Sequence, residues 1–254
     1  MELWRYEREA LEQGHALVCG CDEAGAGPLA GPVYAAAVIL PLGVEIEGLN
    51  DSKKLTEKKR EALFPVIQER AAAWAVAWVD AREIDETDIL SARMKAMQLA
   101  IDQLESRADF ALVDGNRDHG RSAAILTPHR CLVKGDSLSA SIAAASILAK
   151  VSRDRWMVKA AEEYPEYQFQ KHKGYGTKLR VLLRRLHHPM VPAHLGQNGG
   201  RRNGGRQTVP LHKAAVGGED GGAPPVVPVA VDEGEIRPGL QLVYGQLHGL
   251  HAGA

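Results

Sequence analysis

The chain has 254 residues, of which 45% are hydrophobic and 25% are charged, a composition that is ordinary for one or two soluble globular domains. Three cysteines without a CxxC pair argue against a disulfide framework or a zinc knuckle, and they suit a reducing cytoplasm. The charged N-terminus and the lack of a long apolar run argue against secretion and against a membrane-spanning segment, and we expect no membrane partner. The net charge of −1 hides a basic segment, 150–206, with 13 basic and four acidic residues, which suits either a nucleic-acid backbone or a solvated helix face with a basic tail.

The first part of the chain predicts strands at 16–22 and 33–40, because both are short apolar runs bounded by Gly and Pro. A glycine turn joins them. A helix is expected to begin near Thr56, and residues 73–80 are expected to form a third strand. The apolar positions of the helix share one face: Leu63, Phe64, Ile67 and Ala71.

A second helix is predicted by apolar residues that recur at steps of three and four: Leu90, Met94, Met97, Ile101 and Leu104. Apolar runs at 110–114 and 130–136 then predict two further strands, each ending on an aspartate. A long helix is expected from Ser139 to about Glu163, with three basic side chains on its outer side: Lys150, Arg153 and Lys159. A short basic helix is expected at 178–188.

Carboxylates follow three of the predicted strands: Asp22 with Glu23, then Asp114, then Asp136. Functional residues of open α/β sheets gather at strand ends, so this repetition favours a site, although an isolated acidic pair in a turn is usually only solvated. Neighbouring residues of a strand point to opposite faces, so Asp22 and Glu23 converge only if the backbone bends. The glycines of the following turn allow such a bend.

Four carboxylates on one rim would repel one another, and hard oxygen ligands select Mg²⁺ or Mn²⁺. Two such ions, about 3.5–4 Å apart, activate a water and stabilise the leaving oxygen of a phosphodiester. The sequence contains no GxSxG motif, and no histidine has a recognisable serine or cysteine partner. We therefore expect metal-dependent phosphodiester hydrolysis rather than ester hydrolysis by a nucleophile.

Six motifs follow one another over most of residues 16–178: CDEAGAGPLAGPV (21–33), LNDSKKL (49–55), LVDGN (112–116), VKGDS (133–137), SIAAASILAKVSRD (141–154) and HKGYGT (172–177). In this order they resemble the bacterial type 2 ribonuclease H family, ribonuclease HII. The resemblance implies an α/β, ribonuclease H-like fold with a mixed central sheet flanked by helices. It also implies cleavage of the RNA strand of RNA–DNA hybrids, and incision 5′ to ribonucleotides embedded in duplex DNA. We expect a cytoplasmic monomer.

Carried over position by position, the resemblance makes four carboxylates the catalytic metal ligands: Asp22, Glu23, Asp114 and Asp136. Tyr175 matches a tyrosine that stacks at the sugar beside the RNA–DNA junction, where an aromatic face stabilises any base. Gly25 and Gly27 match glycines whose backbone approaches the ribose 2′-hydroxyl. Lys53 and Lys54 match a segment expected to contact phosphate. For the two lysines, a solvated surface role is an equal alternative.

The chain departs from the family pattern at two places. Ala26 stands where the family usually has the arginine of Gly-Arg-Gly, so recognition survives only if backbone amides supply the 2′-hydroxyl contact. A segment that the family places after the tyrosine motif is absent here. We expect an N-terminal helical extension (1–15), a catalytic domain (16–188) and a Gly/Pro/Arg-rich tail (189–254) that is a disordered appendage or the product of a reading-frame change.

Two other functions remain open. The chain could be a noncatalytic hybrid-binding protein that keeps the fold but has impaired turnover. GAGPLAG could also be a phosphate loop, but no Lys-Ser/Thr follows it and Pro28 interrupts it.

Overall fold

The computed structural model describes residues 3–50 and 52–176, all within one compact unit of the chain, residues 1–195. The predicted basic helix at 178–188 and the tail at 189–254 therefore lie outside the described residues. In the described part, no helix has the length and apolarity needed to cross a bilayer.

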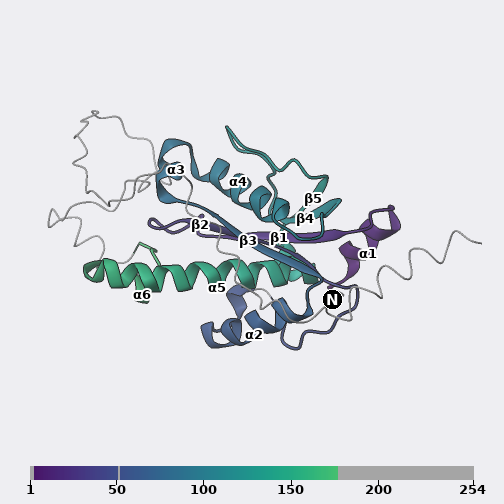
Figure 1. Cartoon of the computed structure of the whole chain (residues 1–254), viewed down its shortest axis with the longest axis horizontal. Helices are drawn as coiled ribbons and strands as arrows, with labels where there is room; N and C mark the ends of the chain where they lie inside the picture. The colour runs from purple at the N-terminus through teal and green to yellow at the C-terminus, as the bar shows by residue number, and fades with distance from the viewer. Residues whose placement is uncertain (1–2, 51, 177–254) are drawn as a thin grey trace, which may run out of the picture. The chain divides into compact units, whose positions relative to one another are not determined.

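A mixed five-stranded sheet in the order β3-β2-β1-β4-β5 forms the centre of the fold (Figure 1). β1 (Val18–Ala24) pairs antiparallel with β2 (Val33–Ile39), which pairs antiparallel with β3 (Ala73–Val79). On its other side β1 pairs parallel with β4 (Phe110–Asp114), and β4 pairs parallel with β5 (His129–Leu132). The predicted mixed sheet is confirmed.

Helices cover both faces of the sheet (Figure 1). Their bounds are α1 (Arg5–Glu12), α2 (Glu57–Arg70), α3 (Ala81–Glu86), α4 (Ile89–Asp102), α5 (Ala140–Glu163) and α6 (Phe169–His172). Three short 3₁₀ turns accompany them: η1 (Ser52–Lys54), η2 (Gly135–Ser137) and η3 (Pro165–Tyr167). α4 packs on one face of the sheet, whereas α5 and α2 pack on the other.

The side-chain alternation of β1 divides its residues between these two faces. Cys19 and Cys21 are fully buried in the core that contains α4. Gly20 faces α5, where a Cβ would lie 2.2 Å from the backbone nitrogen of Ile142. Because only glycine permits this approach, α5 lies directly against β1 at this point. The same alternation decides where the acidic residues that follow point.

The observed helices match the predicted ones where the sequence contains an apolar stripe or an N-cap residue. Thr56 caps α2, and its hydroxyl accepts a hydrogen bond from the Lys59 backbone N–H. Ser139 caps α5 in the same way, through the Ile142 N–H. Leu104 lies beyond the end of α4 but is still buried, because the chain turns back onto the core.

One expectation about α5 is wrong. Arg153 does not lie on the outer side of the helix, because only 1% of its surface is exposed. Its side chain is directed inward, toward the loop between β1 and β2, where it donates to the carbonyl oxygens of Ala30 and Pro32. Lys159 is exposed as expected, whereas Lys150 is half-buried and pairs with Asp154.

Candidate active site

The register of the parallel pair places Asp22 and Asp114 beside each other. Cys21 lies opposite Val113, so the next residue of each strand is one of the two aspartates. Both face α5 because they follow residues that face α4. Asp114 also ends β4. Two carboxylates therefore meet at one sheet edge, as the strand-end argument predicted.

Asp136 reaches this edge through a turn rather than from the end of a strand. β5 stops at Leu132, and Lys134 then adopts a left-handed backbone with φ of 60°. The turn η2 brings the Asp136 N–H to 3.4 Å from Asp114 Oδ1, to which it donates. The expectation of a strand that runs to Asp136 is therefore wrong, because a left-handed residue ends the extended backbone.

Gly135 makes this close approach possible. A Cβ at this position would lie 2.7 Å from Ile142 Cδ1 and 3.2 Å from Asp114 Oδ1. A side chain here would require the Ile142 side chain to shift and would crowd the Asp114 carboxylate. The glycine of the VKGDS motif thus sets the distance between Asp136 and Asp114.

Glu23 lies on the opposite face of β1 from Asp22. Its Oε1 is 2.7 Å from Nη2 of Arg93, a residue of α4. Its Oε2 is buried and has no hydrogen-bond partner among the described residues. The left-handed backbone of Gly25, with φ of 114°, follows the strand and does not turn the two side chains toward one point. Convergence of this pair, which a bend would allow, is not what the structure shows.

Asp22 is held in a buried, acidic environment. Burial raises the pKa of its carboxyl well above the usual value, and the charges of Glu23 and Asp114 raise it further. Hydrogen bonds from the Ser146 hydroxyl and from the Glu23 N–H, at 2.7 Å, oppose that rise in pKa. An ionised Asp22 therefore depends on nearby donors or on a bound cation.

A chain of two hydroxyls leads to Asp22. Ser146 Oγ of α5 lies 2.8 Å from Ser52 Oγ of η1, and both serines are buried. A hydroxyl carries one hydrogen, so when Ser146 donates to the Asp22 carboxylate it must accept from Ser52. The direction of both hydrogen bonds is thereby fixed, and the orientation of Asp22 depends on two elements distant in sequence.

The four acidic residues, which we call the carboxylate rim, are the groups that could hold a divalent cation. Within residues 3–50 and 52–176, no three His, Cys, Asp or Glu side chains are arranged as a metal cage. The donor set is nevertheless all oxygen, and it includes the unpartnered, buried Glu23 Oε2. An open rim of this chemistry fits hard cations such as Mg²⁺ or Mn²⁺.

Lys53 and Lys54 lie beside the rim. Lys53 Nζ is 3.8 Å from Asp136 Oδ2, although its side chain is largely exposed. Lys54 Nζ donates to Ser137 Oγ at 3.2 Å. Both ammonium groups therefore border the turn that carries Asp136, where a phosphate that approached the rim would meet them.

Arg60 of α2 fixes the segment that carries these lysines. Its Nη1 donates to the carbonyl oxygens of Ser52, at 2.9 Å, and of Leu55, at 2.6 Å. Its Nη2 lies 3.7 Å from Oδ2 of Asp154 on α5. The two lysines are thus presented from a backbone that is tied to both helices.

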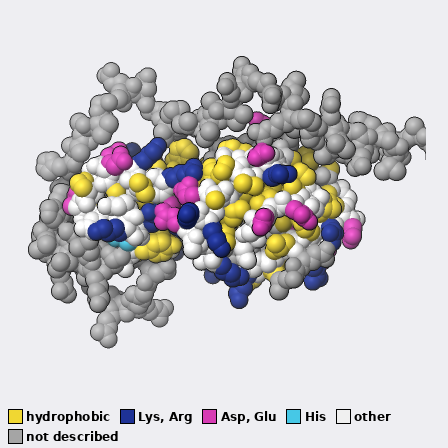
Figure 2. Space-filling view, turned by 90° about the horizontal axis from the view of Figure 1, so that it is seen from below, with side chains coloured by type: hydrophobic (Ala, Val, Ile, Leu, Met, Phe, Trp, Pro, Cys, Tyr) yellow, Lys and Arg dark blue, Asp and Glu magenta, His cyan; other side chains and the backbone are white. Residues whose placement is uncertain are grey.

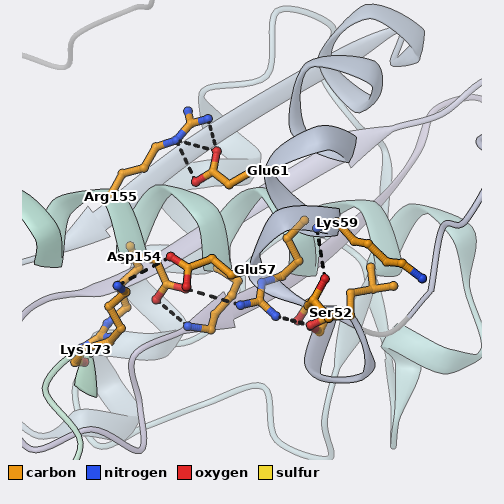
Figure 3. Close-up of polar contacts among 12 residues, drawn as sticks. Ser52, Glu57, Lys59, Glu61, Asp154, Arg155 and Lys173 are labelled. Carbon is orange, nitrogen blue, oxygen red and sulfur yellow. Dashed lines mark hydrogen bonds and ion pairs between the residues drawn. The ribbon is translucent and has the colours of Figure 1, made fainter. Parts of the chain in front are cut away.

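The basic residues of α5 do not form an uncompensated positive patch in the described part of the chain. Figure 2 shows acidic and basic side chains next to one another on this face. Arg155 pairs with Glu61 of α2 at 2.6 Å, and Lys173 Nζ lies 3.7 Å from Glu57 Oε1 (Figure 3). Within residues 150–176, several basic side chains are therefore compensated by acidic partners.

The residues predicted to recognise the substrate lie in the glycine turn after β1 and at Tyr175. Gly27 is exposed, and a Cβ on it would lie 3.8 Å from Tyr175 Cε1. Tyr175 is 49% exposed, so it is not a core residue. Ala26 is half-buried between the two glycines. The structure brings the glycine turn and the tyrosine to one surface.

Three residues of this region escaped the sequence analysis: Arg93, Ser146 and Arg153. Ser146 and Arg153 are seven residues apart, which places them two turns apart on the same side of α5. That spacing of two polar residues, within a motif rich in small and apolar residues, is a signal that could have identified them. The position of Arg93 opposite Glu23 follows only from the packing of α4 on the sheet.

Sequence comparison gives consistent matches. A family model described as Ribonuclease HII matches residues 19–189. The ribonuclease HII of Idiomarina loihiensis is 53% identical over 178 residues, which cover 70% of this chain and 92% of the relative. That of Ruminiclostridium cellulolyticum is 52% identical over 176 residues, covering 69% of this chain and 68% of the relative. For the protein of Geobacillus sp., at 52% identity, the alignment covers 62% of the relative.

Solved structures agree with the fold. Ribonuclease H2 from Pyrococcus horikoshii superposes with a TM-score of 0.54 at 28% identity, covering 65% of this chain and 83% of that one. Ribonuclease HII from Archaeoglobus fulgidus, solved in complex with PCNA, gives 0.57 at 22% identity, covering 73% and 98%. At this low identity, the Archaeoglobus fulgidus structure supports the fold alone. Because the family model spans most of the described fold and the relatives are about half identical, the chain belongs to the ribonuclease HII family of endoribonucleases, which cleave the RNA of RNA–DNA hybrids.

Proposed function

We propose that this chain is a divalent-metal-dependent endonuclease that cleaves the RNA strand of RNA–DNA hybrids and incises 5′ to single ribonucleotides in duplex DNA. The observation that carries the proposal is the pair Asp22 and Asp114 on adjacent parallel strands, with Asp136 hydrogen-bonded to the second. The fold alone does not require buried carboxylates to gather at one edge. The free-energy cost of gathering these buried carboxylates is best explained by a cation that they bind.

The carboxylate rim would hold the metal: Asp22, Asp114 and Asp136 would be ligands, and Glu23, whose charge also acts on Asp22, would be the fourth. Members of the family require divalent metal ions. When bound, two such ions supply an activated water and charge stabilisation for the leaving oxygen of the phosphodiester. The hydroxyl of Ser146 would keep the Asp22 carboxylate oriented, through the hydrogen bond described above.

Substrate recognition would use the surface formed by the glycine turn and Tyr175. The exposed backbone of Gly27 would approach the ribose 2′-hydroxyl, the group that distinguishes RNA from DNA. The ring of Tyr175 would stack at the neighbouring sugar and base. Lys53 and Lys54 would contact phosphate beside the rim. Ala26 adds no charge, so phosphate anchoring at this point would be weaker than with an arginine.

The expected setting is removal of ribonucleotides and hybrids during DNA repair and replication in the cytoplasm, by a monomer. The reducing environment is supported by two cysteines that are fully buried and a third that is partly buried, none in a disulfide. We expect no membrane partner.

A nicking assay tests the function. The protein is incubated with Mg²⁺ or Mn²⁺ and either a continuous RNA–DNA hybrid or a DNA duplex that contains one ribonucleotide. We expect cleavage of both, leaving a 3′-hydroxyl and a 5′-phosphate, and none of an all-DNA duplex. A folded protein that binds the hybrid but does not nick it would instead support the noncatalytic hybrid-binding protein, for which the neutral Ala26 is the argument.

A further inference from the structure

We propose that Arg153 is a positioning residue that clamps the two substrate-recognition segments together. The segments are the glycine loop, residues 25–32, and the Tyr175 segment, residues 173–175. The inference rests on the proposed function, because it assigns to Arg153 the geometry of the surface that would read the ribonucleotide. Arg153 itself touches neither substrate nor metal in this account.

The guanidinium of Arg153 donates to both segments at once. Nε donates to the Pro32 carbonyl at 3.0 Å, and Nη2 to the Ala30 carbonyl at 2.8 Å. Nη1 donates to the Lys173 carbonyl at 2.9 Å. One side chain of α5 therefore joins a loop more than 120 residues earlier in the chain to a turn 20 residues later.

The chemistry of arginine suits this task. A guanidinium carries five N–H donors in a planar fork, so it can serve three carbonyls that lie in different directions. Within the described residues, its hydrogen bonds all go to backbone carbonyls, while the adjacent Asp154 pairs with Lys150 and Arg60. A buried charge with neutral acceptors is costly to maintain, and it stabilises chiefly the arrangement of those carbonyls.

Glycines in both segments allow the backbone to close around the side chain. At Gly25 a Cβ would lie 2.4 Å from Arg153 Nε, and the backbone there has a left-handed φ of 114°. At Gly174 a Cβ would lie 2.4 Å from the Ala30 carbonyl oxygen. A direct hydrogen bond, from Leu29 N–H to the Gly174 carbonyl at 2.9 Å, completes the contact between the segments.

The recognition surface exists only while the segments are joined. Gly27 lies in one segment and Tyr175 in the other, and a Cβ added to Gly27 would lie 3.8 Å from Tyr175 Cε1. Without the clamp, the two groups that would read the 2′-hydroxyl and stack on the sugar would move independently. Binding would then have to order them, which weakens affinity for the substrate. The chemistry at Asp22 and Asp114 does not depend on the position of Tyr175.

The experiment compares Arg153→Lys and Arg153→Met with Arg155→Lys, a matched variant of an exposed arginine on the same helix that pairs with Glu61. KM and kcat are measured on the duplex with one ribonucleotide. We expect KM to rise about tenfold or more for both Arg153 variants, with kcat within about threefold, and no change for Arg155→Lys. Lysine keeps the positive charge but lacks the planar set of guanidinium N–H donors, so Arg153→Lys should not restore the wild-type KM.

Hydrogen exchange of the Leu29 amide gives a readout that does not require activity. We expect exchange to become at least about tenfold faster in Arg153→Lys, while the amides of β1 keep their protection. Unchanged KM with unchanged Leu29 protection would overturn the clamp. Loss of the whole fold in both variants would also overturn it, since Arg153 would then be a core residue.

A wild-type protein that fails to nick would reject the proposed function, and the Leu29 exchange would still decide the clamp. A fall in kcat at constant KM would place the effect of Arg153 on the rim rather than on recognition, and would contradict the proposal.

Discussion

The two halves of the candidate site are built by different means. The carboxylate rim is set by the register of parallel strands, which brings like charges together and leaves Asp22 and Glu23 on opposite faces of β1. The recognition surface is instead set by one buried arginine that holds backbone carbonyls of two loops. The carboxylates of the rim therefore repel one another, whereas the recognition surface is held together by hydrogen bonds. Damage to each should affect a different kinetic quantity.

The largest expected effect is at the rim. Asp22→Asn and Asp114→Asn should each lower kcat by about a thousandfold or more, because each removes a charged ligand at the centre of the proposed chemistry. Circular dichroism should show an intact fold. Glu105→Gln, a change of an exposed carboxylate after α4, is the matched control and should cleave normally. Normal turnover in Asp22→Asn would contradict the assignment of Asp22 as a metal ligand.

The hydroxyl chain to Asp22 should show the next largest effect. Ser146→Ala removes the donor to the Asp22 carboxylate, so we expect kcat or Mn²⁺ affinity to fall about 10- to 100-fold. KM for the duplex should change little, since the recognition surface is untouched. Calorimetric Mn²⁺ binding and steady-state kinetics give both quantities. Ser152→Ala, on the same helix, is the control, and an equal loss there would refute the assignment.

Repulsion at the rim has a consequence for stability without metal. Burial raises the pKa of Asp22, so the native state holds its proton more tightly than the unfolded state. The stability from this group is complete at acidic pH and is lost as pH rises through the raised native pKa. In EDTA at pH 8, Asp22→Asn should therefore be more stable than wild type, on the order of 1–3 kcal/mol. Equal denaturation midpoints across pH 5 to 8 would contradict this.

The smallest expected effect concerns the lysines. Lys53→Ala should raise KM only a few-fold and lower the slope of log affinity against log salt by about one, because an exposed ammonium contributes one phosphate contact. Lys58→Ala, an exposed lysine of α2, is the control. An unchanged salt slope in Lys53→Ala would favour the solvated-surface alternative.

Much of the fold follows from local patterns in the sequence. The apolar runs that became β1 to β4 and the stripe of α4 are buried because their period matches one face or one layer of the fold. Asp136 was misplaced because its position depends on the left-handed conformation of Lys134, which no apolar pattern encodes. Arg153 was predicted to lie on the outer side of α5. The prediction failed because its partners are backbone carbonyls of a distant loop, and every residue type has a backbone carbonyl, so the sequence does not indicate such partners.

The site shows the same limit. The motifs identified its members, but not that Glu23 would face Arg93 across the strand from Asp22, since that depends on how α4 packs. The proximity of Gly27 and Tyr175 likewise depends on contacts between segments about 150 residues apart. The strand pattern predicted that Asp22 and Asp114 would meet, whereas contacts that depend on loops and on helix packing were not predictable.

The most direct test measures Asp22→Asn and Arg153→Lys side by side on a duplex that contains one ribonucleotide, recording the cleavage rate at saturating duplex and the affinity for the duplex. We expect Asp22→Asn to lose the rate and keep the affinity, and Arg153→Lys to lose affinity and keep the rate. If both variants lose the same quantity, the division between a catalytic rim and a separately clamped recognition surface is wrong.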